Sequence, residues 1–265
     1  MTQGASAITL PSRFQPVVGI EVDGLLAVPA TYSGQVIEEE ITMSRHAYPR
    51  VTQSEPRWDE DGTWASGWRF SRLGREWVAD LLTRGVEVVW ASTWLEHANT
   101  TFSPVLGLPS LPVVLTEENW TGPTVGDAKV RQIARRFDDR PLLLITELPP
   151  LQGRSALPAS RRPQDHAVTR LHVIPYSTGV SERDIATLNH WLDLAQSPHG
   201  HEELRRLRRR DLARARRAAK RSNEASATPP PPADERGEAL RRLTDRYASL
   251  YPSGYLDDVR DGWPG

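Results

Sequence analysis

The sequence predicts an α/β fold, with a Rossmann-like, mainly parallel sheet flanked by helices and followed by a C-terminal helical extension. Short apolar runs alternate with helical periodicities between residues 16 and 197. Such runs are typical of parallel strands that are buried on both faces. Polar and acidic residues follow several of these runs directly, at the position where open α/β sheets bind their ligands.

The first predicted strand covers residues 16–22, after a loose lead-in formed by residues 1–15. Two carboxylates, Glu21 and Asp23, end this strand, and Gly24 follows at once. An ordinary acidic turn is the alternative interpretation of this pattern. A strand end that carries two acids favours metal and phosphate chemistry.

Residues 30–69 show no sustained period, so we expect a long excursion with a short hairpin near Val36–Met43. Residues 24–70 are predicted to form a flap or small cap over the strand ends. The tryptophans of this region either line a pocket or pack in the core. A helix is predicted over residues 71–84, because apolar side chains recur there every four residues and Gly85 stops the pattern.

The remaining elements follow in order up to residue 197. Strands are expected at Val86–Ala91, Leu111–Leu115, Leu142–Ile145 and Leu171–Ile174. Helices are expected at Glu96–Val105, at Lys129–Phe137 and after Ser181, which is placed to cap the last of them.

A basic helix is predicted over residues 198–221. Between His199 and Arg221 there are ten Lys or Arg against three acidic residues, so this segment carries +7 and the rest of the chain −8. A proline-rich linker, residues 222–235, and a short helix with a tail, residues 236–265, complete the chain.

The arginines lie opposite an apolar stripe that begins at Leu204, and this pattern predicts an amphipathic helix over residues 204–221. Such a basic face binds nucleic acid or an acidic protein, folds back on the acidic body of the chain, or is simply a solvated run of charges. Aromatic residues are not interleaved with the arginines, so base stacking is not indicated.

The composition excludes several classes of site. The chain has no cysteine, which rules out disulfides and thiolate metal ligands. No stretch approaches the roughly 18 apolar residues of a membrane span, and the N-terminus does not resemble a secretion signal. We therefore expect a cytoplasmic protein, and its oligomeric state is not predicted.

Four polar motifs stand at the ends of predicted strands or at the start of a helix. They are Glu21-Val22-Asp23-Gly24, Ser92-Thr93, Lys129 and Thr146-Glu147. Taken in this order, they resemble the haloacid dehalogenase-like (HAD) phosphohydrolase superfamily over residues 16–197. The stretch from Trp90 to Val114 looks like one particular bacterial branch of it, and Tyr176–Ser181 also fits.

The resemblance implies a HAD-like phosphatase that acts on a phosphorylated small molecule or nucleotide with Mg²⁺. Asp23 then matches the general acid and base, and Ser92 or Thr93 matches the hydroxyl that binds the phosphoryl group. Lys129 matches the neutralising cation. Taken alone, Ser92-Thr93 has the alternative interpretation of a helix cap, and Lys129 that of a solvated helix residue.

The family's nucleophilic Asp is replaced here by Glu21, and its acidic pair by Thr146-Glu147. The implied metal ligands are therefore Glu21, Asp23 and Glu147. A nucleophile that is longer by one methylene is misplaced by about 1 Å, which can cost about 100-fold in rate. We expect weakened or lost activity. The alternative is that the longer carboxylates of Glu21 and Glu147 shift together and keep a metal ion between them. The alternative function is a non-catalytic module that binds a phosphorylated ligand, nucleic acid or protein.

Overall fold

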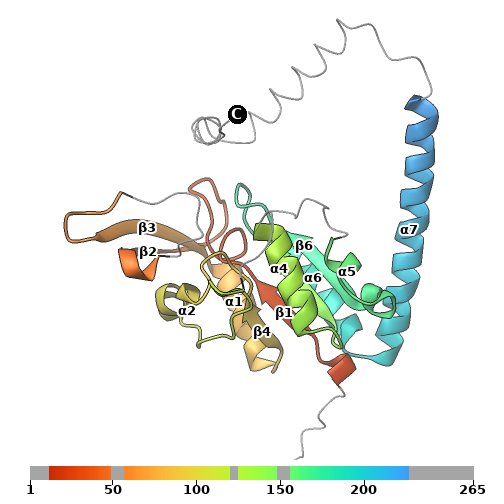
Figure 1. Ribbon diagram of the computed structural model, residues 1–265, viewed down its shortest axis with the longest axis horizontal. Helices are drawn as coiled ribbons and strands as arrows, with labels where there is room; N and C mark the ends of the chain where they lie inside the picture. The colour runs from red at the N-terminus through yellow and green to blue at the C-terminus, as the bar shows by residue number, and fades with distance from the viewer. Residues whose placement is uncertain (1–11, 49–56, 120–124, 148–155, 227–265) are drawn as a thin grey trace, which may run out of the picture. The chain divides into compact units, whose positions relative to one another are not determined.

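The structure is a computed structural model, and it describes residues 12–48, 57–119, 125–147 and 156–226. The chain divides into two units, residues 1–208 and residues 209–265. The first unit holds all of the sheets and most of the helices (Figure 1). No helix in the described ranges is long and apolar enough to cross a membrane.

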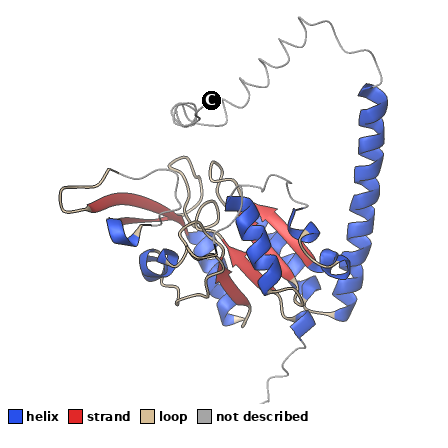
Figure 2. Ribbon diagram, viewed as in Figure 1, coloured by secondary structure: helices blue, strands red, loops and turns tan. Residues whose placement is uncertain are grey.

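A four-stranded, all-parallel sheet forms the centre of the first unit, with the strand order β4-β1-β5-β6 (Figure 2). Its strands are β1 (Val17–Ile20), β4 (Glu87–Trp90), β5 (Leu142–Thr146) and β6 (Thr169–Val173). The predicted α/β class with a parallel sheet is confirmed. Strand β1 lies between β4 and β5, so that Gly19 is flanked by Val89 and Leu144.

Helices cover both faces of the sheet. They are α1 (Arg72–Thr83), α4 (Val125–Arg136), α5 (Ala156–Ala159) and α6 (Glu182–Ala195). Alternate side chains of β1 face opposite layers, because Val18 and Ile20 pack with α1 and α6 whereas Val17 packs with α4 and α5. In Figure 1, α4 lies in front of the sheet.

Side-chain caps fix the starts of α1 and α6. Ser71 accepts a hydrogen bond from the backbone N–H of Gly74 at 3.1 Å. Ser181 and Asp184 form a reciprocal capping box, in which each side chain accepts from the other residue's backbone N–H. The predicted cap at Ser181 is therefore confirmed, and Gly85 ends α1 with φ 72°.

A long hairpin occupies part of the predicted excursion. It pairs β2 (Val36–Ser44) with β3 (Thr63–Ser71) in a separate antiparallel sheet. The short hairpin predicted near Val36–Met43 is instead the single strand β2 of this longer hairpin. The second strand is missed because Ser66 and Gly67 interrupt its alternation of aromatic and polar side chains. The role of residues 24–70 as a flap or cap stays a prediction.

Aromatic rings pack between this hairpin and the helices after β4. Trp68 and Trp94 each contact Phe102 edge-on, with ring centroids 5.0 and 4.7 Å apart. Tyr48 contacts Trp94 in the same way at 5.5 Å. These rings therefore act as a packed core, which is one of the two roles expected for the tryptophans.

The predicted strand at Leu111–Leu115 is wrong. Only Val113 forms a bridge, to Trp90. The side chain of Asn99 both accepts from the N–H and donates to the C=O of Leu111, each at 2.8 Å, so it takes the backbone groups that a strand would use.

The predicted helix at Glu96–Val105 is present as two short helices, α2 (His97–Thr101) and α3 (Ser103–Leu106). Among the described residues, sequence analysis misses α5 and three short 3₁₀ helices. Those 3₁₀ helices are Ser12–Phe14, Arg45–Ala47 and Pro163–Val168.

The basic helix, α7, spans Pro198–Ser226, which is five residues longer than the predicted end at residue 221. Its first turns belong to the first unit, where Leu204 is buried and His201 contacts the backbone carbonyl of Ala195 at 2.8 Å. Residues 1–11 of the lead-in, the linker from residue 227 and residues 236–265 lie outside the described residues.

Gly24 allows the turn after β1 to approach the end of β6. It adopts φ 81°, and a Cβ at this position would collide with the backbone carbonyl of Ile174. Gly62 has a similar φ of 75°, but a Cβ there would have nothing within 4 Å. The two glycines therefore share the same backbone strain but differ in their surroundings.

We expect Gly24→Ala to lower the free energy of unfolding by about 3 kcal/mol or more, because left-handed strain and a backbone collision add. Gly62→Ala, which carries only the strain, should cost about 1 kcal/mol. Urea unfolding followed by circular dichroism measures both values. Equal losses in the two variants would contradict the close approach of Gly24 to Ile174.

Candidate functional site

The sheet order brings the carboxyl ends of β4, β1 and β5 together. Because β1 is central and the chain continues to β4 on one side and to β5 on the other, the ends of these strands form a topological switch point. Glu21, Ser92 and Thr146 each end or follow one of the three strands. The candidate site lies at this edge of the sheet.

Two contacts between β1 and α4 set the position of Lys129. Gly19 and Glu21 lie two residues apart and face the same side of β1, and Ile133 and Lys129 lie one helical turn apart on α4. A Cβ at position 19 would collide with the side chain of Ile133, so glycine lets α4 approach closely. Gly19 and Glu21 on the strand, and Ile133 and Lys129 on the helix, are each about 6 Å apart along their element. The contact of Gly19 with Ile133 therefore places Lys129 beside Glu21.

Glu21 is held by three donors. Its Oε1 forms an ion pair with the ammonium group of Lys129, and its Oε2 accepts from the Thr146 hydroxyl and from the backbone N–H of Glu147, both at 2.8 Å. Only 5% of the Glu21 side chain and 3% of the Lys129 side chain are exposed. The charge of Glu21 is thus neutralised and its oxygens are occupied inside the protein.

Two further carboxyl groups lie close to this ion pair and lack a comparable partner charge. Burial, followed by the negative charge of Glu21, raises the pKa of Asp23 to about 7. Burial, followed by the charges of Asp23 and Glu21, raises the pKa of Glu147 to about 7. Lys129 opposes both shifts, but its single positive charge is shared among three acids.

Tyr176 is a site residue that sequence analysis did not predict as such, since it named Tyr176–Ser181 only as part of the family resemblance. Burial raises its pKa, and the charges of Asp23 and Glu147 add to the shift. It comes two residues after Ile174, whose carbonyl lies against Gly24, and this contact brings Tyr176 to the acidic pair. Its position three residues after the last strand, β6, was the available signal.

The structure places Ser92 after β4, at the same edge of the sheet as the ion pair. Ser92 is buried and accepts from the backbone N–H of Trp94 at 3.3 Å. No hydrogen bond between described residues joins Ser92 or Thr93 to Glu21 or Lys129. The turn that carries them contains Leu95 at φ 51°, the single described non-glycine residue with a positive φ.

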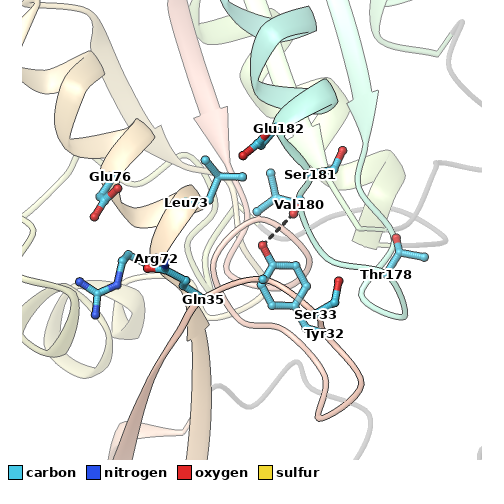
Figure 3. Close-up of a pocket in the computed structure, with 11 residues that line it drawn as sticks. Tyr32, Ser33, Gln35, Arg72, Leu73, Glu76, Thr178, Val180, Ser181 and Glu182 are labelled. Carbon is cyan, nitrogen blue, oxygen red and sulfur yellow. Dashed lines mark hydrogen bonds between the residues drawn. The ribbon is translucent and has the colours of Figure 1, made fainter.

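Two surface hollows lie near this part of the fold. One, of about 340 Å³, is lined by Tyr176 together with Ala27, Trp68 and Arg69 of the hairpin side. The other, of about 460 Å³, lies between the starts of α1 and α6 (Figure 3). The second hollow contains none of the sequence-predicted site residues, and its Tyr32 hydroxyl already donates to the Val180 carbonyl at 2.9 Å.

The three carboxylates predicted to bind Mg²⁺ can be compared with the ligands that this ion requires. Within the described ranges, no group of three or more His, Cys, Asp or Glu side chains is arranged to hold a metal ion. Glu21 does not fit as a ligand, because its oxygens are occupied by Lys129, Thr146 and Glu147. Asp23 and Glu147 match only the number of carboxylates that Mg²⁺ commonly uses, with water and phosphate completing its shell.

Removing Lys129 tests the cost of the buried pair. We expect Lys129→Met to lower the free energy of unfolding by about 3–5 kcal/mol, because Glu21 is left buried without its counter-charge. The double variant Glu21→Gln, Lys129→Met should recover most of this loss. Arg135→Met, on an exposed position of the same helix, serves as the control and should change stability by less than about 0.5 kcal/mol.

The raised pKa of Asp23 predicts a pH effect in metal-free protein. Its folded pKa of about 7 lies above its ordinary value of 3.8, so the folded state binds more protons between these values and stability falls as the pH rises through them. Asp23→Asn should therefore lose less stability than wild type between pH 5 and pH 7.5, measured by urea unfolding in EDTA. Asp211→Asn, at an exposed position, should follow wild type. Parallel curves for Asp23→Asn and wild type would contradict the assignment.

Comparisons with protein-family models, with curated proteins and with solved structures found no match for this chain.

Proposed function

We propose that this chain is a HAD-like phosphohydrolase-type protein for a phosphorylated substrate, with its phosphoryl transfer weakened or lost at Glu21. The main observation behind this proposal is that both oxygens of the Glu21 carboxylate are engaged, by Lys129, by the Thr146 hydroxyl and by the Glu147 backbone N–H. These contacts bring together Glu21 at the predicted nucleophile position, the predicted cation Lys129 and the predicted acidic pair Thr146-Glu147. The same arrangement removes the nucleophile from the ligand's reach.

Burial and neutralisation both oppose attack by Glu21. An attacking carboxylate needs a free oxygen in contact with the phosphorus atom, and 5% side-chain exposure leaves little surface for that contact. Moving Glu21 toward a ligand would also strip Lys129 of its partner inside the protein, which is costly. The predicted loss of activity thus has two causes, which are the added methylene of Glu21 and the burial of its carboxylate against Lys129.

Asp23 and Glu147 are the groups that support a retained ligand site. In the metal-free protein, a pKa of about 7 lets Asp23 give or take a proton near neutral pH, which suits a general acid and base. Mg²⁺, held by Asp23 and Glu147, would supply positive charge for the phosphoryl oxygens. Without such a cation, the carboxylates would repel a phosphorylated ligand, because Lys129 already serves Glu21.

The second candidate is a module that binds a phosphorylated ligand without turning it over. The burial of Glu21 favours it, since a binding site does not need an accessible nucleophile. The two candidates share the same ligand and the same Mg²⁺ requirement. They differ in whether shortening the carboxylate at position 21 produces turnover.

Phosphate release from an aryl phosphate and from a panel of nucleotides, with Mg²⁺ or with EDTA, tests the proposal. We expect wild type to be slow, and Glu21→Asp to be faster, because the shorter side chain withdraws from at least one donor and exposes an oxygen. A gain of about 10-fold to 100-fold corresponds to correcting a misplacement of about 1 Å. The gain should vanish in EDTA and in Glu21→Asp, Asp23→Asn.

Ligand binding by each variant is measured in parallel. If no variant releases phosphate but wild type binds a phosphorylated ligand with Mg²⁺, the chain is the binding module. If it neither turns over nor binds any phosphorylated ligand, the proposal fails. Glu39→Asp is the matched control, because it shortens an exposed carboxylate on the hairpin and should leave both properties unchanged.

A further inference from the structure

The described part of the second unit presents an exposed basic surface on α7. It contains five arginines within nine residues, which are Arg209, Arg210, Arg214, Arg216 and Arg217. All five are exposed, and none forms an ion pair with another described residue. Earlier in the same helix, in contrast, Arg206 binds Glu203 through two hydrogen bonds of 2.7 Å.

These five arginines form one continuous face. At 3.6 residues per turn they occupy a sector of about 160°, with the small side chain of Ala213 near its centre. Asp211, the acidic residue in this stretch, falls about 60° outside the sector by the same geometry. The face is therefore positive across its whole width.

The charge density of this face matches that of a regular polyanion. The five arginines are spread over roughly 12 Å of helix axis at 1.5 Å per residue, about one charge per 2.4 Å. Duplex DNA carries one phosphate charge per about 1.7 Å of its axis. Arginine's planar fork of donors also suits phosphate oxygens better than the ammonium group of lysine does.

We propose that this face of α7 binds the phosphate backbone of double-stranded DNA without sequence preference. The major groove of B-form DNA, about 12 Å wide, admits an α-helix. With Ala213 toward the groove, Arg209 and Arg216 lie on one flank and the other three arginines on the opposite flank, so that the two groups reach opposite phosphate strands. This activity is separate from the candidate site in the first unit and does not depend on it.

Other nucleic acids fit the surface less well. A-form RNA has a deep, narrow major groove, which does not accommodate a helix with arginines on both flanks. Single strands are usually held by aromatic side chains that stack on bases, and residues 209–218 contain no aromatic residue. Without base-stacking or amide side chains on this face, contacts are limited to the backbone.

A membrane surface is also a poorer match. Helices that lie in a lipid interface bury large apolar or aromatic side chains on the face opposite their basic residues. On the described part of α7 beyond Arg208, the exposed apolar side chains are Leu212 and three alanines. One leucine supplies little of the apolar area that stable insertion needs.

Fluorescence anisotropy of a labelled 20-base-pair DNA duplex, titrated with the full chain, tests the proposal. We expect binding that weakens by about two to three orders of magnitude between 50 and 200 mM salt, as five phosphate contacts require. The triple variant Arg209→Gln, Arg214→Gln, Arg216→Gln should reduce the salt slope by about three. Glutamine favours helix, so circular dichroism should show unchanged helix content.

The control variant replaces Arg57, Arg135 and Arg183, which are exposed in the first unit, by glutamine. It removes the same charge and should bind duplex DNA like wild type. The proposal is overturned if duplex DNA does not bind, or if both triple variants weaken binding equally. Tighter binding to duplex RNA, to single strands, to polyglutamate or to vesicles of anionic lipid would also overturn it.

Discussion

The buried contact between Glu21 and Lys129 organises the edge of the sheet. It joins the end of β1 to α4, and through Thr146 and Glu147 it also joins the end of β5. Two buried charges are tolerated only when each is satisfied by its partner and by further hydrogen bonds. The three donors around Glu21 meet this condition, so one interaction both fixes the packing of α4 and sets the charges that neighbouring groups experience.

The electrostatics of the candidate site follow from how that one positive charge is used. Lys129 is engaged with Glu21, so Asp23 and Glu147 face each other and Glu21 without full compensation. Near neutral pH the site can reduce this repulsion by holding protons or by taking up a cation. An excess of negative charge of this kind repels a free anion.

The sequence was sufficient for the class of the fold and for the four strands of the parallel sheet, because apolar runs and caps such as Ser181 are local signals. It was insufficient where distant residues decide the structure. Asn99 takes the backbone groups of Leu111 and prevents a strand there. Tyr176 joins the acidic pair only because Gly24 brings two distant turns into contact. The saturation of Glu21 likewise depends on the closeness of α4, which no motif specifies.

The close fit of Gly19 against Ile133 and of Glu21 against Lys129 also restricts how this protein can evolve. Replacing either member of the ion pair alone leaves a buried charge without its partner, so such intermediates are poorly stable. Aspartate at position 21 keeps the charge and is the small step open to the chain. Change at this edge of the sheet is therefore restricted to substitutions that keep one negative and one positive charge in contact.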